Sequence, residues 1–255
     1  MKKTKLLVGT VIGCMVTGQA MAGIIFSEDW ESHSAGAAIQ SANGWTAVTC
    51  CGEPTSEILV QQASGGSPAG MSGNYGNGTA GGSSTGGYIN LNPAGIGSGL
   101  DPTKEYILSW TWYNSGDDAH GPEFGFAHSS HNNFGTRISL EGGYNDKAGR
   151  SRLLSRNNGE DGAGWPGDGV AVDYEIRMTK DSVSGWRDGS QTAGAGMDEA
   201  TFVGHDGIYW FADFSGGTSR NAGDIDNITL RVIPEPATLG LLALGGMIAL
   251  FRRRG

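Results

Sequence analysis

Histidine, serine and acidic side chains are the residues that could carry catalysis, and their spacing in this chain does not favour it. His128 and His131 are the closest histidine pair, but a separation of three residues places them on opposite faces of a strand. Ser129, His205 and Asp206 are the right residue types for nucleophilic catalysis, yet no Gly-x-Ser-x-Gly turn frames any serine. The pattern therefore gives little support to a hydrolase of this kind.

Paired carboxylates are a second route to catalysis, because glycoside hydrolysis uses two acids about 5 to 9 Å apart. Concanavalin A-like glucanases place three alternating acids on one strand within an aromatic frame, and this chain has only pairs. No glycine-rich loop followed by a lysine and a helix is present to bind phosphate. We therefore expect a protein that is not an enzyme. The alternating acids are Asp29/Glu31, Asp173/Glu175 and Asp224/Asp226.

The final residues, 232–255, combine three features in a fixed order. Pro234, Glu235 and Pro236 form a stiff extended element, because proline fixes its own φ and disfavours helix in the preceding residue. An uncharged apolar run, Ala237–Phe251, follows. It is short for a membrane span, but the arginines after it stay on the cytoplasmic side and extend the span by snorkelling. The order predicts a transmembrane helix stopped by Arg252, Arg253 and Arg254.

Together these residues resemble the PEP-CTERM sorting signal of exported proteins of Gram-negative bacteria. The resemblance implies exosortase as a partner, a membrane-embedded cysteine transpeptidase that cuts near Pro234–Pro236 and releases or transfers the body. The expected route passes through an intermediate anchored in the inner membrane and ends at the cell surface or in the extracellular space. An uncleaved tail anchor is the alternative.

The opposite end of the chain predicts a secretory signal peptide over residues 1–22. Three lysines precede an apolar run, and Ala20-Met-Ala22 forms a small-x-small cleavage site, so the mature chain would start at Gly23. The implied partners are the Sec translocon and signal peptidase. A lipobox ending at Cys14 is the alternative interpretation.

Residues 23–231 form one predicted domain, since a chain of this length is enough for a single all-β core. The domain holds 11 Lys and Arg against 25 Asp and Glu, a net charge of −14. Nucleic acid is not an expected partner, because phosphate binding requires a basic surface. Cys50 and Cys51 are adjacent, which leaves a vicinal disulfide, a bond to another chain and free thiols open.

Glycine accounts for 45 of the 255 residues, and short aromatic and β-branched runs separate its clusters, as is typical of many strands joined by tight loops. The run from Tyr106 to Tyr113 alternates, with Tyr106, Leu108, Trp110 and Trp112 on the predicted core face. Residues 65–87 carry almost no large apolar side chain, which predicts a long loop. The predicted strands are 24–30, 58–61, 88–91, 106–114, 124–128, 136–140, 152–156, 172–179, 183–187, 207–214 and 227–233.

Four segments of the body resemble known β-sandwich domains. Phe26–Gly36, Asn43–Trp45 and Asp224–Arg231 resemble parts of concanavalin A-like and carbohydrate-binding-module jelly rolls, and Tyr174–Gly189 resembles a laminin-G-type hairpin. The implied fold class is an all-β jelly-roll sandwich. Its first and last strands would pair and gather five acids, Glu28, Asp29, Glu31, Asp224 and Asp226.

Clustered carboxylates repel one another unless a cation lies among them, so a structural calcium ion is one hypothesis for these acids. The alternative is that strand alternation sends the acids to opposite faces or to solvent, where Asp224 and Asn227 shape a turn. No other cofactor is expected.

The jelly-roll resemblance extends to carbohydrate binding, in which aromatic faces stack on sugar rings. Trp165, in the glycine-rich segment Gly162–Gly167, is the leading candidate, followed by Trp45 and Trp186. The leading interpretation is a non-enzymatic protein of the cell surface or extracellular matrix that associates with exopolysaccharide. The alternatives are a carbohydrate-binding module with a defined glycan ligand and a secreted glycan-active enzyme.

Overall fold

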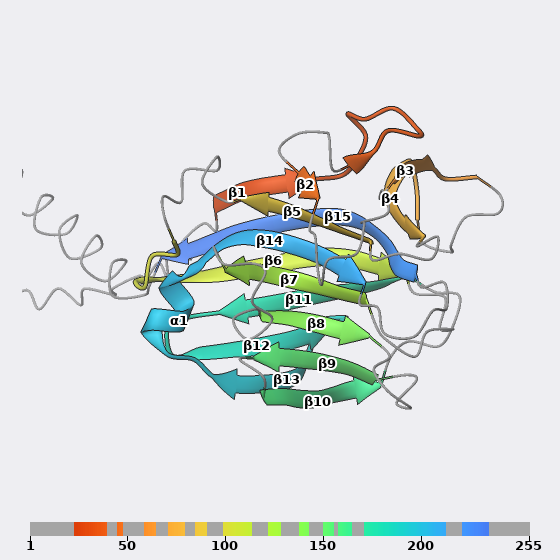
Figure 1. Cartoon of the computed structure of the whole chain (residues 1–255). Helices are drawn as coiled ribbons and strands as arrows, with labels where there is room; N and C mark the ends of the chain where they lie inside the picture. The colour runs from red at the N-terminus through yellow and green to blue at the C-terminus, as the bar shows by residue number, and fades with distance from the viewer. Residues whose placement is uncertain are drawn as a thin grey trace, which may run out of the picture. The chain divides into compact units, whose positions relative to one another are not determined.

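The computed structural model shows a sandwich of two antiparallel β-sheets, with the short helix α1 (Glu199–Val203) at one end (Figure 1). This confirms the predicted all-β fold class. The strand order, within the described residues, is β13-β12-β11-β6-β15-β4-β3 in an eight-stranded sheet, where β1 also pairs with β15, and β10-β9-β8-β7-β14-β5-β2 in a seven-stranded sheet. The structure describes residues 23–39, 45–47, 59–64, 71–79, 85–90, 99–113, 122–128, 138–142, 150–155, 158–164, 171–212 and 221–234.

Most strands in both sheets are short, as the glycine clusters predicted, although β6 has 10 residues and β15 has 14. The eight-stranded sheet contains β1 (Gly23–Glu28), β3 (Leu59–Gln62), β4 (Asn74–Thr79), β6 (Lys104–Tyr113), β11 (Val172–Met178), β12 (Ser182–Arg187), β13 (Ser190–Gly196) and β15 (Asn221–Pro234). The seven-stranded sheet contains β2 (Trp45–Ala47), β5 (Thr85–Asn90), β7 (Pro122–His128), β8 (Ile138–Gly142), β9 (Arg150–Ser155), β10 (Asn158–Gly164) and β14 (His205–Ala212).

The core lies between the sheets and is rich in tryptophan. The alternation on β6 is confirmed, because Tyr106, Leu108, Trp110 and Trp112 are each at most 2% exposed. Trp110 reaches across the core to Phe124 of β7, with ring centroids 4.7 Å apart. Such aromatic packing contributes stability beyond the area that it buries.

The first and last strands pair, as the jelly-roll resemblance implied. In the antiparallel register of β1 and β15, Phe26 lies opposite Leu230 and Glu28 opposite Ile228. The first strand ends two residues earlier than predicted, because Trp30 has a φ of 61° and turns the chain inward. Its indole Nε1 donates a hydrogen bond to the carbonyl of Ile225 at 2.9 Å, which fixes the turn on β15.

The prediction of one long loop over residues 65–87 is wrong, because β4 lies within this range. In the sheet, β4 pairs with β3 on one side and β15 on the other. Gly76 of β4 lies where the core leaves no room for a side chain. A Cβ atom at Gly76 would lie 2.9 Å from Cζ3 of Trp210 and 3.2 Å from Cε2 of Trp30. The indole rings thus fill the space that a side chain on β4 would need.

The laminin-G-like hairpin is present as β11 and β12, where Tyr174 lies opposite Arg187 and Met178 opposite Val183. Asp188 and Gly189 then turn the chain into β13 with φ values of 46° and 75°. Positive φ at both turn residues is the geometry that Asp-Gly favours in two-residue hairpins. The strands β2, β4, β10 and β13 and helix α1 were not among the sequence predictions.

Several predictions fall outside the described residues: the signal peptide with its cleavage residues Ala20 and Ala22, the cysteines Cys50 and Cys51, the apolar tail, and Arg252–Arg254. In the part of the chain that is described, no helix is long and apolar enough to cross a membrane. The predicted domain boundary between residues 231 and 232 lies inside β15, which continues to Pro234.

Candidate functional site: a polar groove on the eight-stranded sheet

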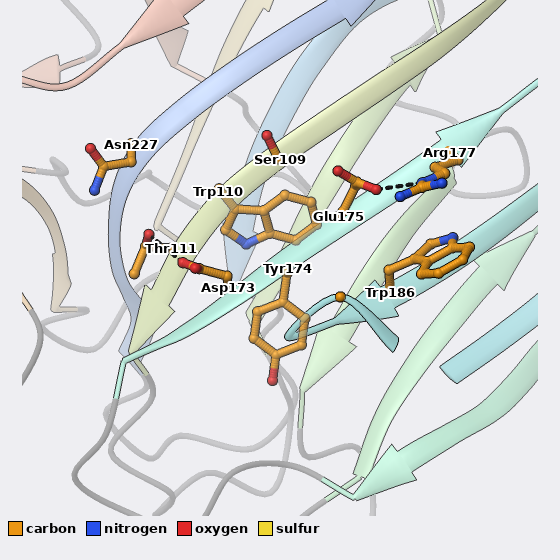
Figure 2. A pocket seen from close by; sticks show the side chains of 10 residues that line it. Ser109, Trp110, Thr111, Asp173, Tyr174, Glu175, Arg177, Trp186 and Asn227 are labelled. Atoms are coloured by element: carbon orange, nitrogen blue, oxygen red, sulfur yellow. Dashed lines mark hydrogen bonds and ion pairs between the residues drawn. The ribbon is translucent and has the colours of Figure 1, made fainter. Parts of the chain in front are cut away.

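A groove of about 450 Å³ lies on the eight-stranded sheet, over strands β6, β11, β12 and β15 (Figure 2). Most of its side chains come from the strand positions that alternate with the core positions. Trp110 and Tyr174 also line it, although both are 2% exposed and belong to the core. The lining residues are Ser109, Trp110, Thr111, Asp173, Tyr174, Glu175, Arg177, Trp186, Gly189 and Asn227.

Strand register brings the groove residues into rows across the sheet. Glu175 of β11 lies opposite Ser109 of β6 on one side and Trp186 of β12 on the other. One step along, Asp173 lies opposite Thr111. Side chains two residues apart on a strand share a face, so both rows project from the same side of the sheet.

Glu175 is the centre of a charged cluster in the groove. Its Oε1 accepts a hydrogen bond from Nε of Arg177, and its Oε2 accepts one from Nη2 of Arg231 at 2.8 Å. The Glu175 side chain is 17% exposed, and the two arginines are 38% and 36% exposed. Two guanidinium groups therefore hold one carboxylate in a fixed orientation.

Trp186 and Arg177 form one end of the groove. The guanidinium carbon of Arg177 lies 4.0 Å from the ring centroid of Trp186, within the range of a cation–π contact. The indole Nε1 donates to Oγ of Ser184 at 2.9 Å, which fixes the plane of the ring. The half-buried indole is thus oriented from two sides on the surface of the sheet.

The other end of the groove carries the polar side chains of Thr111, Asp173 and Asn227, as Figure 2 shows. Thr111 Oγ1 donates to Oδ1 of Asp173 at 2.8 Å. Asn227 has a φ of 53° at an irregular step in the pairing of β15 with β6, and its side chain is exposed. Carboxylate, hydroxyl and amide groups therefore line the same groove as the indole ring of Trp186.

The three predicted stacking residues have different outcomes. Trp186 lines the groove. Trp45 is 2% exposed and packs 5.8 Å from the ring of Trp30, so its ring has no face open to a sugar and this prediction is corrected. Trp165 follows β10 directly and lies outside the described residues.

The predicted calcium ligands make separate contacts around the turn that contains Trp30. Glu28 accepts the backbone N–H of Trp30 at 2.9 Å through Oε1, and its Oε2 lies 3.2 Å from Nε2 of His33. Glu31 accepts the backbone N–H of Asn74 at 2.8 Å. These bonds tie the loop after β1 to the start of β4.

The remaining predicted ligands also have hydrogen-bond partners. Asp29 accepts the backbone N–H of Glu31 at 3.2 Å, and Asp224 accepts from Nδ2 of Asn77 at 2.7 Å. Asp226 is 3% exposed and accepts the backbone N–H of Asn227 at 2.7 Å. Burial, with smaller contributions from the charges of Glu31 and Asp29, raises the pKa of Asp226 to about 6.

No group of three or more His, Cys, Asp or Glu side chains among the described residues, which include all five acids, is placed to hold a metal ion. Glu28, Asp224 and Asp226 are buried, which differs from the alternative that sends the acids to solvent, and calcium binding remains a prediction. Of the catalytic sets considered, His205 is fully buried, and Ser129 and His131 lie outside the described residues.

The groove itself was missed by sequence reasoning. Asp173, Glu175 and Arg177 alternate on a predicted strand, which does indicate a polar outward face. Arg231 comes from β15 and Asn227 from an irregular step in its pairing, and neither placement follows from a local pattern.

Solved structures with similar folds support the jelly-roll sandwich fold of this domain. Lectin II from Ulex europaeus is 10% identical with a TM-score of 0.54, and the match covers 83% of this chain and 100% of the lectin. A carbohydrate esterase from the Shiga toxin-encoding bacteriophage phi24B is 15% identical with a TM-score of 0.52, covering 84% of this chain and 100% of the esterase. At sequence identities this low, the structural similarity is evidence for the fold alone. A search of curated proteins found no match to the sequence.

The C-terminal segment identifies how the protein is sorted. Residues 232–254 match the family model described as the PEP-CTERM protein-sorting motif. The chain is therefore an exported protein whose C-terminal motif directs processing by exosortase, as the order of Pro234–Pro236, apolar run and arginines predicted.

Proposed function

We propose that the β-sandwich binds carbohydrate without catalysis and associates with exopolysaccharide at the cell surface or in the extracellular matrix. The observation that carries the proposal is the groove in which Trp186, Arg177 and Glu175 are held by one another and by neighbouring side chains. The sorting motif supports it, because an exported protein meets polysaccharide outside the cell.

The groups in the groove suit the chemistry of sugars. Hydroxyl groups of a pyranose both donate and accept hydrogen bonds, and charged partners such as Asp173 and Arg177 make the stronger ones. An oriented indole supplies an apolar wall for the C–H face of a sugar ring. Small-molecule sites commonly combine such a wall with a few fixed polar groups.

The charge balance favours an uncharged glycan. Glu175 pairs with both Arg177 and Arg231, so the exposed carboxylate of Asp173 brings the four charges to zero. The domain around them has a net charge of −14. An acidic polysaccharide would be repelled by this surface, whereas a neutral one would not.

A secreted glycan-active enzyme is the second candidate, because Asp173 and Glu175 alternate on β11 and both line the groove. Against it, both carboxylate oxygens of Glu175 are bound by arginine. Release of reducing ends from polysaccharide by the purified protein would favour the enzyme over the binding module.

The binding proposal can be tested by affinity electrophoresis of the purified protein in gels that contain exopolysaccharide from its host or neutral and acidic reference polysaccharides. We expect retardation of the wild-type protein by the host polysaccharide and by a neutral one. The Trp186→Ala variant should lose it, with affinity reduced about tenfold or more, because the stacking contact and the apolar area that it buries are together worth roughly 1.4 kcal/mol or more.

The control is Lys180→Ala in the turn between β11 and β12, where Lys180 and Asp181 form an exposed ion pair outside the groove. This variant should migrate as the wild type does. Equal retardation of the Trp186→Ala variant and the wild type would place binding elsewhere.

A further inference from the structure

A row of side chains crosses six strands of the eight-stranded sheet and passes through the groove. Each member lies opposite the next in the antiparallel register, and side chains that lie opposite one another project from the same face of a sheet. The hydroxyl oxygens of Ser109 and Thr229 are accordingly 2.6 Å apart. From β1 to β13, this cross-strand row consists of Ser27, Thr229, Ser109, Glu175, Trp186 and Gln191.

The two ends of the cross-strand row are open to solvent. Ser27 and Gln191 are both exposed. Between them, Ser109, Glu175 and Trp186 line the groove, and Figure 2 shows these three on neighbouring strands, one after another. A ligand that lies along the row can therefore extend beyond the groove in both directions.

A filled row of side chains bounds the cross-strand row on one side. Ile107 alternates with core residues of β6 and so belongs to the outward face, yet it is only 4% exposed. Its neighbours across the strands are Arg177 and Arg231, whose guanidinium groups both bind Glu175. Because the stems of arginines can cover apolar surface, these three side chains form a wall along the groove.

The opposite side of the cross-strand row carries exposed polar groups. Asp173 lies two residues before Glu175 on β11, and Arg177 lies two residues after it, so the row runs between a carboxylate and a guanidinium group. The side chain of Asn227 is exposed at the β15 end of the groove. Hydroxyl groups on both edges of a sugar chain would therefore meet charged or polar partners.

The width of the groove across the strands gives the length of chain that it can hold. Its lining residues come from four neighbouring strands, β15, β6, β11 and β12. Adjacent strands lie about 4.8 Å apart, so the groove spans roughly 14 Å in this direction. One unit of an extended polysaccharide advances by a distance similar to one strand spacing, and the groove therefore holds about three units.

We propose that the groove binds an internal stretch of a linear, neutral polysaccharide that lies across the strands along the cross-strand row. The inference rests on the carbohydrate binding proposed above. One unit stacks on Trp186, the next lies over Glu175 and Ser109, and a third reaches Asn227. The chain continues past Ser27 and Gln191, so binding requires neither of its ends.

The length of the bound stretch can be measured with oligosaccharides of about two to eight units, made by partial acid hydrolysis of the host exopolysaccharide and separated by size. In titration calorimetry with the mature protein, affinity should rise about tenfold or more between two and four units, because each added unit gains contacts in the groove. Longer oligosaccharides should gain little more. Equal affinity for two units and for eight would overturn the inference.

The use of internal units is tested by altering the ends of the chain. Borohydride reduction opens only the last ring at the reducing end, so it should leave the affinity of the longest oligosaccharides unchanged. On intact polysaccharide, the number of protein molecules bound per chain should rise with chain length. A loss of affinity on reduction, or one protein bound to chains of any length, would overturn this inference and leave carbohydrate binding intact. Failure of all fragments and of the intact polysaccharide to bind would overturn the proposed function as well.

The Asn227→Gly variant tests the direction in which the chain lies. Glycine keeps the positive φ of this position and removes the amide, so oligosaccharides of about four units should bind about threefold or more weakly, whereas those of two units should bind as they do to the wild type. Asp188→Gly is the control, because exposed Asp188 also has a positive φ and lies in the turn after β12. Equal binding of the longer oligosaccharides by Asn227→Gly and Asp188→Gly would contradict this placement of the chain.

Discussion

Asp226 is a residue whose ionisation is coupled to the fold. It is 3% exposed on β15, and burial together with the nearby charges of Glu31 and Asp29 raises its pKa to about 6. A raised pKa means that the folded protein binds this proton more tightly than the unfolded chain does. The resulting stability is complete below the unfolded pKa of 3.8 and is lost as the pH rises through about 6.

The Asp226→Asn variant should therefore lose this pH dependence. An amide can still accept the N–H of Asn227, and it stays uncharged at every pH. We expect the variant to exceed the wild type in free energy of unfolding by about 1–3 kcal/mol at pH 7.5 and to differ little at pH 4. Urea unfolding at both pH values measures this. If the exposed control Asp181→Asn shows the same gain, or if Asp226→Asn shows none at pH 7.5, the assignment is wrong.

At the scale of elements, β4 shows why part of the fold could not be predicted from sequence. The sequence Asn74–Thr79 contains Tyr75 and Thr79 but also two glycines and two asparagines, which are depleted in strands. The strand forms because Trp30 and Trp210, far away in the chain, fill the space above Gly76. Tertiary contacts of this kind leave no local pattern, whereas the alternation on β6 was visible because it depends only on neighbouring residues.

Gly76→Ala tests this account of β4. The added Cβ would meet both indole rings at distances that real Cβ atoms rarely show, so we expect a loss of about 1–3 kcal/mol in the free energy of unfolding. Gly196→Ala is the matched control, because a Cβ there meets nothing within 4 Å. Thermal or urea unfolding of the two variants should separate them, and equal stability would argue that β4 does not pack as described.

The contact between the β1 turn and β15 allows a similar test of the calcium prediction. Glu28, Glu31 and Asp224 each accept a hydrogen bond from a protein N–H group, so hydrogen bonds within the protein contribute to holding the turn. We expect the melting temperature of the protein to change by less than about 1 °C after treatment with EDTA. A substantial fall that is reversed by added calcium would instead establish a structural calcium site.

At the scale of the whole molecule, the chain combines an acidic β-sandwich with a C-terminal sorting motif, and the sandwich carries a groove whose charges balance. If the groove binds neutral sugar through hydroxyl contacts and stacking, affinity should depend little on ionic strength, because salt screens interactions between net charges. We expect the dissociation constant to change less than about threefold between 50 and 500 mM NaCl. Steep weakening with salt would show that a charged polysaccharide is the ligand.

The proposal that this groove binds exopolysaccharide is tested most directly by titration calorimetry of the mature protein with polysaccharide purified from its host. The account predicts saturable binding by the wild type and affinity lowered about tenfold or more in both Trp186→Ala and Glu175→Gln, since each removes a group that orients the groove. Circular dichroism of both variants would show that the fold is kept. No binding by the wild type, or equal binding by the wild type and both variants, would contradict the account.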